Sequence, residues 1–287
     1  MPNSSKYTST SKEVLRYSAE STGFFAHLLS IWQHRRLILT LGFRDIRLRY
    51  TKTKLGFVWI IAQPLLAAAI FQVFFTKLFV FDVGLPEDIP FFLFAFIGFT
   101  GWLLFTNMMY GVGQALITEE QLIQKVAFPK IILLLSKGIQ PILDFVVCNI
   151  VAGGIALLFF PIPIQWKILW WIPATLSIVC VGFVLGLWSA ILSRKHRDVL
   201  HLLPFIANFG IWLTPVFYST ELIPQTWRAY LQFNPLVSYI EMLRLSYFGQ
   251  AWVSYPTFFI SLGILLLFGL WGMVYLYRVE HEFADAH

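Results

Sequence analysis

The sequence has little charge, few cysteines and no glycine-rich loop for a nucleotide. Charged residues make up 13% of the 287 positions, whereas hydrophobic residues make up 58%. A soluble domain of this length needs far more charge to cover its surface, which excludes the class of soluble globular proteins. Because no glycine is followed by lysine, the phosphate-binding loop G-x-x-x-x-G-K-[ST] is absent. The chain cannot hydrolyse ATP through such a loop.

Residues typical of metal and catalytic sites are also scarce. The histidines show no H-x-x-x-H spacing and no Cys/His cluster, so we predict no metal site. Cys148 and Cys180 both lie in apolar segments, where two buried small side chains are expected before a disulfide. No Ser/His/Asp arrangement can be inferred, and we expect neither catalysis nor a cofactor in this chain. No apolar segment precedes residue 24, so no cleavable signal peptide is predicted.

The sequence is rich in long apolar segments. A bilayer crossing takes about 20 largely apolar residues, and six segments qualify: 55–80, 89–112, 131–160, 168–192, 199–219 and 256–277. Such segments must be helices, because the period-two alternation of a barrel is absent. The predicted fold class is all-α and polytopic. It comprises a cytoplasmic region at 1–54, a six-span domain at 55–277 and a cytoplasmic tail at 278–287.

Lysine and arginine are unevenly distributed between these spans. The region before residue 55, the connections after the second and fourth spans, and the C-terminal tail hold 17 of the 21 basic residues. Basic residues mark cytoplasmic loops, so we predict a multi-pass protein of the bacterial inner membrane with both termini in the cytoplasm. The net charge of +6 is then a topology signal, and no nucleic-acid partner is expected.

The region before the first span predicts an amphipathic helix over Leu28–Tyr50. One stripe is apolar, and the opposite stripe is cationic, which is typical of a helix lying in the membrane interface. A solvated linker is the alternative. Asp45 and Arg49 have the i,i+4 spacing of an ion pair. The apolar stripe comprises Leu28, Trp32, Leu39, Phe43, Ile46 and Tyr50, and the polar stripe Gln33, Arg36, Arg44 and Arg47.

The connection 113–130 predicts a short cytoplasmic helix. Thr118 and Gln121 have the spacing of a capping box, and Pro129 would stop the helix. A helix where a turn would suffice indicates a docking element. Its candidate docking residues are Glu119, Glu120, Lys125, Phe128 and Pro129.

Two spans carry polar residues. Asp144 in the third span, beside a kink expected at Pro141, is a functional candidate because carboxylates are rare in membranes; pairing with a neighbouring helix is equally expected. The fifth span carries a polar and aromatic stripe that should face water, a substrate path or a partner helix, with plain helix packing as the alternative. Its residues are His201, Phe205, Asn208, Trp212 and Pro215.

The segment 220–255 predicts two short helices, one starting near Pro224 and one at Pro235 with Asn234 as N-cap. Glu241 and Arg244 can pair at i,i+3. Each helix is too short to cross the bilayer, so we predict a re-entrant pair in the outer leaflet.

Motifs spread over residues 44–285 resemble Wzm-type permeases, which export O-antigen and related polysaccharides. Order and spacing carry this resemblance more than any single motif, and the final Ala286-His287 departs from the family pattern. The motifs are Arg44–Tyr50, Lys54–Trp59, Gln63-Pro64, Leu122–Lys130, Thr214–Tyr218, Asn234-Pro235-Leu236 with Glu241 and Arg244, and Glu282–Asp285.

The resemblance implies a homodimer with two copies of a separate ATPase subunit, which would bind ATP and Mg²⁺, and a glycan substrate built on undecaprenyl pyrophosphate. It implies that the cytoplasmic helix contacts the ATPase. It further implies a channel lined by the first and fifth spans (Trp59, Gln63, His201, Phe205, Asn208 and Trp212) and a periplasmic gate (Tyr218, Asn234, Pro235, Glu241 and Arg244).

The basic residues before the first span suit the substrate's pyrophosphate, because arginine and lysine both bind phosphate oxygens. A purely topological role of these residues is the alternative. They are Arg44, Arg47, Arg49, Lys52 and Lys54.

Other transport classes remain open. Capsule and teichoic-acid permeases have a similar layout, and an ABC permease for a small substrate fits the composition. A secondary transporter should show inverted repeats and several midplane charges, of which Asp144 is the only strong one. A membrane-bound acyltransferase should carry a catalytic histidine motif, and none is apparent.

Overall fold

The computed structural model describes residues 31–51, 56–78, 84–126, 128–160, 165–231, 233–250 and 254–284. Every regular element in these ranges is helical, which confirms the predicted all-α class. In chain order they are α2 (Arg35–Tyr50), α3 (Val58–Val73), η1 (Phe74–Leu78), α4 (Phe91–Thr118), α5 (Glu120–Lys125), α6 (Lys130–Ser136), α7 (Ile139–Phe159), η2 (Trp166–Trp170), α8 (Trp171–Ser193), α9 (Val199–Leu213), η3 (Thr220–Leu222), α10 (Gln225–Leu231), α11 (Pro235–Phe248) and α12 (Tyr255–Ala284).

Five helical segments are long and apolar enough to cross a membrane, and they match the predicted first, second, third, fourth and sixth spans. The segments are Val58–Leu78, Phe91–Thr118, Lys130–Phe159, Trp166–Ser193 and Tyr255–Val279. The predicted fifth span corresponds to the shorter apolar helix α9. A sixth crossing therefore stays a prediction.

Helix α9 ends earlier than predicted. Thr214 has an extended backbone, with φ −117° and ψ 131°. The reason is Pro215, because a proline disfavours the helical conformation of the residue before it. Pro215 is thus outside the helix and buried, and the prediction that it continues the stripe of α9 was wrong.

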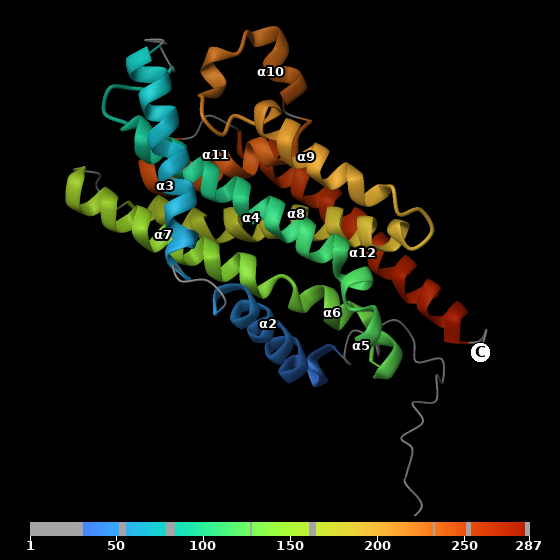
Figure 1. Cartoon of the computed structure of the whole chain (residues 1–287). Helices are drawn as coiled ribbons and strands as arrows, with labels where there is room; N and C mark the ends of the chain where they lie inside the picture. Colours follow the sequence, from blue (N-terminus) through green and yellow to red (C-terminus); the bar gives the residue numbers. More distant parts are fainter. Residues whose placement is uncertain are drawn as a thin grey trace, which may run out of the picture.

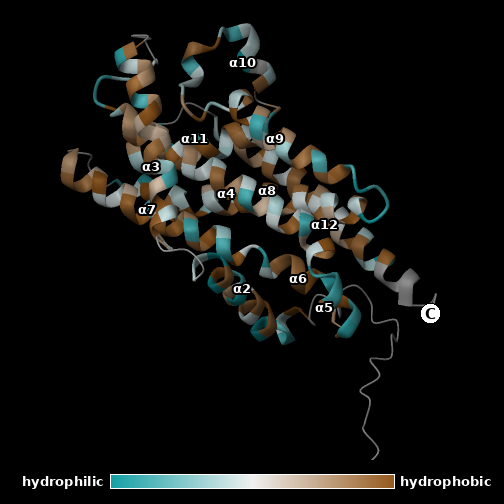
Figure 2. Ribbon diagram, in the orientation of Figure 1, coloured by the Kyte–Doolittle hydropathy of each residue, from teal (hydrophilic) through white to brown (hydrophobic). Residues whose placement is uncertain are grey.

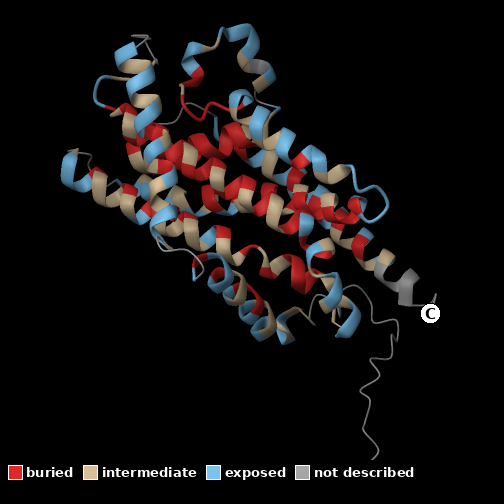
Figure 3. Cartoon of the chain, in the orientation of Figure 1, coloured by how far each residue is buried: buried red, intermediate tan, exposed pale blue. Residues whose placement is uncertain are grey.

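Helices α4 and α8 form the centre of the bundle (Figure 3). Within the most apolar window of each span, 78% of the residues are buried in α4 but only 17% in α3. Small residues allow α8 to approach α4 closely, as is common between membrane helices. A Cβ atom on Gly186 would lie only 2.7 Å from the Cβ of Val112.

The two ends of the bundle carry different elements (Figure 1). Helices α2 and α5, the α8–α9 connection and the C-terminal end of α12 lie at one end, and α10 and the end of α3 lie at the other. Hydrophilic residues gather in α2, α5, α10 and the α8–α9 connection (Figure 2). Helix α2 and the end of α12 therefore lie at the same end of the bundle.

The third span is broken near its start. Helix α6 ends at Ser136, and α7 begins at Ile139. Pro141 has no N–H to bond the carbonyl oxygen of Lys137 four residues earlier. Just before Pro141 the chain also makes a tighter turn, in which the Gly138 N–H donates to the Leu135 oxygen three residues earlier, at 3.1 Å. The break places Lys137 at the junction of α6 and α7.

Helix α11 begins as predicted. The Asn234 side-chain oxygen accepts a hydrogen bond from the Leu236 N–H at 3.1 Å, and Pro235 is the first helical residue. Gly249 ends the helix in the left-handed region, with φ +70°. Because α11 packs against α4, α8 and η2, nearly all its residues are buried. Its depth in the outer leaflet stays a prediction.

One local prediction in the cytoplasmic elements was wrong. Thr118 is the last residue of α4, and Glu119 caps α5 without a side-chain hydrogen bond, so the capping box does not form. In the predicted apolar stripe of α2, Ile46 and Tyr50 are buried against the bundle, and Leu39 and Phe43 are half exposed. A position of this helix in the membrane interface stays a prediction. The predicted start of this helix at Leu28 lies outside the described residues.

Candidate functional site

The predicted stripe on α9 is exposed. His201, Phe205, Asn208 and Trp212 are all exposed, and Leu203 is the one buried residue of the helix. The apolar Leu213 of the same helix is also 66% exposed. Helix α9 therefore packs on the bundle by a narrow edge and leaves most of its surface uncovered.

Helix α3 presents a similar face. Trp59 and Gln63 are exposed, and Phe71 lies next to Trp212 of α9, with ring centroids 6.3 Å apart. Within the described part of the chain, the Gln63 and Asn208 side chains make no hydrogen bond. Unsatisfied amides are costly in lipid. We call Trp59, Gln63, His201, Phe205, Asn208 and Trp212 the path face.

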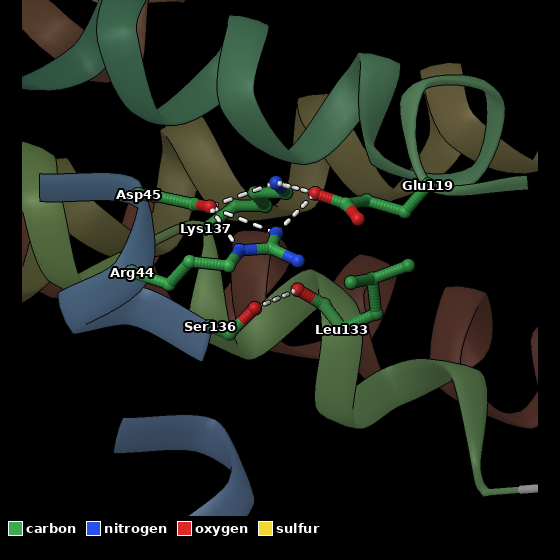
Figure 4. Close-up of polar contacts among 6 residues, drawn as sticks. All are labelled: Arg44, Asp45, Glu119, Leu133, Ser136 and Lys137. Atoms are coloured by element: carbon green, nitrogen blue, oxygen red, sulfur yellow. Dashed lines mark hydrogen bonds and ion pairs between the residues drawn. The ribbon is translucent and has the colours of Figure 1, made fainter. Parts of the chain in front are cut away.

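A network of four charged side chains joins α2 to the C-cap of α4 and to the junction of α6 and α7 (Figure 4). The Lys137 ammonium group lies 2.8 Å from an Asp45 oxygen and 2.8 Å from a Glu119 oxygen. The Arg44 guanidinium group lies 2.8 Å from Asp45 and also bonds Glu119. Two cations thus balance two carboxylates. We call Arg44, Asp45, Glu119 and Lys137 the inner network.

The inner network shifts the pKa of two of its members. Burial tends to raise the pKa of Glu119, but hydrogen bonds from Lys137 and Arg44 outweigh it, and the pKa is lowered from 4.5. Burial likewise tends to lower the pKa of Arg44, and its bonds to Glu119 and Asp45 raise it overall. Both groups are therefore held in their charged forms.

The inner network changes the predicted role of several charges. Asp45 pairs with Arg44 and Lys137, so the predicted pair with Arg49 was wrong. Arg49 instead lies 3.8 Å from Asp144, which also accepts a hydrogen bond from the Tyr50 hydroxyl at 2.7 Å. Asp144 therefore pairs with neighbouring residues, which was one of the two interpretations.

These contacts also sort the basic residues predicted to attract pyrophosphate. Arg44 and Arg49 have carboxylate partners, whereas Arg47 is exposed and has no acidic partner among the described residues. Lys52 and Lys54 lie outside the described residues. Of the five, Arg47 is the described residue best placed to bind an external anion.

The predicted docking residues differ in their exposure. Glu120 and Lys125 are exposed on α5. Phe128 is half-buried and packs on the core near α6, and Pro129 caps α6. Glu119 pairs with Arg44 and Lys137 in the inner network, so it is not an exposed charge of α5, and its part in docking stays a prediction. It points inward because it is the C-cap of α4, where the chain turns toward Lys137.

A buried ion pair lies near the opposite end of α4. Arg244 is 0% exposed and Glu241 is 1% exposed, and their charged groups are 2.9 Å apart, as the i,i+3 spacing predicts. The Arg244 guanidinium group also donates to the carbonyl oxygens of Pro215 at 2.7 Å and Val216 at 2.6 Å. It lies 3.4 Å from the centre of the Phe94 ring, a cation–π geometry.

Two other predicted gate residues bind the same segment after α9. The Tyr218 hydroxyl donates to the Trp212 carbonyl oxygen at 2.8 Å, and the Asn234 amide donates to the Thr214 hydroxyl at 2.9 Å. Pro235 is half-buried at the start of α11. We call Tyr218, Asn234, Glu241 and Arg244 the outer clamp, because together they fix residues 212–216.

Two features were not predicted from the sequence. Lys137 is one of the 17 basic residues that indicate the topology, and its position beside a glycine at a helix break lets its side chain reach a neighbouring helix. Helix α4 also has a polar face at Asn107, Gln114 and Thr118, whose i, i+7 and i+11 spacing was visible in the sequence. Among the described residues, no three His, Cys, Asp or Glu side chains lie close enough together to hold a metal ion.

Comparison with known proteins places these features in a family context. The family model described as ABC-2 type transporter matches residues 36–248. A relative from Klebsiella pneumoniae, the O-antigen export system permease protein RfbA, is 25% identical over 87% of this chain and 94% of its own length. RfbA of Myxococcus xanthus is 26% identical over 72% of this chain and 78% of its own length. The capsule polysaccharide export inner-membrane protein CtrC of Neisseria meningitidis is 22% identical over 85% of this chain and 94% of its own length.

Proposed function

This chain belongs to the ABC-2 type transporter family, and from that premise we propose that it is the membrane subunit of an exporter for a lipid-linked polysaccharide. Relatives named as O-antigen export permeases match it over most of its length. We expect the chain itself to catalyse no reaction. Export would be driven by ATP and Mg²⁺ bound to a separate ATPase subunit.

The path face is the observation that carries this proposal. Its aromatic rings and its amides lie on two apolar helices, α3 and α9, and all of them are exposed. Lipid is a poor environment for the Gln63 and Asn208 amides. A second copy of the chain and a water-filled path between the two copies would satisfy them, so a homodimer is the expected assembly.

The chemistry of the path face suits a sliding glycan. Sugar rings have apolar C–H faces that stack on aromatic side chains, and their hydroxyls exchange hydrogen bonds with amides. The stripe from His201 to Trp212 extends roughly 16 Å along α9, at about 1.5 Å per residue. It could therefore contact several sugar units through weak, repeated contacts, as conduction requires.

The ATPase would bind at the end of the bundle that carries α5. Glu120 and Lys125 are its exposed charges, and the C-cap of α4 directly before α5 belongs to the inner network. Movement of α5 would thus reach α2 and α7 through ionic contacts. Both termini would lie on this cytoplasmic side, with two ATPase copies on each homodimer, and Arg47 on α2 would attract the substrate's diphosphate.

Complementation tests this proposal. The gene for this chain, expressed together with that of its ATPase partner, should restore surface polysaccharide to a strain lacking its own O-antigen permease. The chain alone, or the pair with an ATPase defective in hydrolysis, should not. Surface glycan is measured by immunoblot on intact cells. Export by the chain without any ATPase would contradict the proposal.

A capsule-type exporter is the second candidate, because a capsule polysaccharide export protein is among the relatives. The same expression plasmids placed in a strain lacking its capsule permease separate the two candidates. Restoration of capsule but not of O-antigen would favour this candidate.

A further inference from the structure

Helix α4 carries a polar face that is separate from the path face. Asn107, Tyr110, Gln114 and Thr118 follow one another at helical spacing within a helix that otherwise forms the apolar core. In the described part of the chain, the side chains of Asn107, Gln114 and Thr118 make no hydrogen bond. Polar groups at membrane depth are normally satisfied by protein, water or ligand. This face of α4 is therefore expected to be in contact with water or a ligand.

The polar face of α4 opens into a groove. A cavity of about 530 Å³ lies between α2, α4 and α7 and is lined by Asn107, Tyr110, Gln114 and Gln140 among others. Its inner end shares Arg49, Asn107 and Pro141 with a second cavity of about 70 Å³, which reaches Trp59 and Gln63 of the path face. The groove thus leads from the end of the bundle that carries the inner network toward the path face.

The charges around the groove balance. Its carboxylates are those of Asp45, Glu119 and Asp144, and each has a cationic partner in Arg44, Lys137 or Arg49. A site for a diphosphate needs an excess of positive charge, and this groove has none. What remains for a ligand are amides and hydroxyls, which both donate and accept hydrogen bonds.

We propose that this groove binds a neutral sugar ring of the lipid-linked glycan before the glycan enters the path between the two copies. The proposal rests on the proposed export function and names a recognition site for the same substrate. Asn107 and Gln114 would bond the sugar hydroxyls, and the ring of Tyr110 would cover a C–H face of the sugar. The volume of the groove falls in the range of small-molecule sites, about 300–1,000 Å³.

Leucine substitutions at Asn107 and Gln114 test the groove. If each amide makes one hydrogen bond to the sugar, Asn107→Leu and Gln114→Leu should each slow export about fivefold. Neither should lower the melting temperature of the purified protein, because neither amide bonds the protein. Gln225→Leu, which removes an exposed amide from α10, is the matched control and should export normally. Normal export by both groove variants, or a loss of stability in both, would overturn the proposal.

Photo-crosslinking gives a second, direct measurement. A p-benzoylphenylalanine residue at position 114 should form an adduct detected by anti-glycan serum in cells that make the glycan. The same residue at position 267, an exposed position of α12, should not. Phospholipid adducts alone at position 114 would overturn the sugar site. Failure of the wild-type chain to restore export would instead contradict the proposed function, which keeps the two failures apart.

Discussion

The inner network and the outer clamp are both ionic, but they differ in their access to water. They contact α4 near its two ends, at Glu119 and Phe94. Arg244 of the outer clamp is fully buried, whereas the Arg44 side chain of the inner network is 36% exposed. The outer pair adds hydrogen bonds to backbone carbonyl oxygens, and the inner network consists of side chains alone.

This difference suggests different mechanical roles. Separating a buried ion pair strongly destabilises the folded protein. The outer clamp should therefore hold residues 212–216 in one arrangement. Partly exposed charges interact more weakly and exchange partners at low cost, because water compensates them. The inner network can therefore rearrange when α5 moves, while the outer clamp keeps the end of α9 fixed.

Loss of Arg244 should have the largest effect. Arg244→Leu leaves the Glu241 carboxylate buried without a partner, and we expect it to lower the free energy of unfolding by about 3–5 kcal/mol. Denaturation of the purified protein in detergent, followed by tryptophan fluorescence, measures this loss. Glu241→Gln combined with Arg244→Leu should recover part of it, because the Pro215 and Val216 carbonyl oxygens still lack the arginine. If the double variant is no more stable than Arg244→Leu, the buried carboxylate is not the cause.

Crowding of the outer clamp should have the next largest effect. A Cβ atom on Gly98 would lie 2.4 Å from the Arg244 guanidinium group and 2.5 Å from the Val216 carbonyl oxygen. Because the backbone cannot yield easily, Gly98→Ala should destabilise the protein by about 3 kcal/mol, at the upper end of typical overpacking. Gly153, with nothing within 4 Å of its position for a Cβ, is the matched control. Gly153→Ala should be neutral or stabilising, and equal losses at both glycines would contradict the packing of Arg244.

The two neighbouring glutamates should respond differently to charge reversal. Glu119→Lys places a third cation beside Lys137 and Arg44, and we expect a loss of about 1–2 kcal/mol in the free energy of unfolding. Glu120→Lys lies on the exposed surface of α5 and should leave stability unchanged while weakening co-purification of the ATPase. Melting temperature and ATPase recovery are measured on the same preparations. Equal loss of stability in both variants would contradict the inward position of Glu119.

Acid should weaken the inner network by a smaller amount. The pKa of Glu119 is lowered in the folded protein from its ordinary value of 4.5, so its ionised form stabilises the fold. Its contribution is complete above about pH 4.5 and is lost as the pH falls through the lower folded-state pKa. Glu119→Gln should flatten this part of the melting temperature curve between pH 6 and pH 3. An unchanged pH dependence in the variant would show that Glu119 is not the titrating group.

The sequence was sufficient for features that depend on local spacing. The all-α class, the cap at Asn234 and the i,i+3 pair of Glu241 and Arg244 were all predicted from residues close together in the chain. Contacts between distant segments were not. Asp45 had a suitable partner in Arg49 four residues away, but Lys137 and Arg44 bind it instead. Local spacing shows which pairs are possible, whereas the packing of α2 on α7 decides which of them form.

The exposed faces of α3 and α9 were predicted only in part. Periodicity identified the stripe from His201 to Trp212, but it could not show that apolar residues of the same helix, such as Leu213, are exposed as well. Helix α9 contacts the bundle along a narrow edge, and the sequence pattern does not give the width of that contact. The groove beside α4 was missed because its walls come from three helices that are distant in the sequence.

The central claim is that the path face lines a water-filled path between two copies of the chain. It is tested most directly with single cysteines in a Cys148→Ala/Cys180→Ala background, labelled in membranes with a membrane-impermeant maleimide. We predict labelling at positions 63, 201, 205, 208 and 212 during ATP turnover, and protection at the buried position 203 and at position 267, an exposed position of α12 that we expect to face lipid. Protection of all five path positions throughout turnover would contradict the claim and would mean that this face meets lipid or another helix.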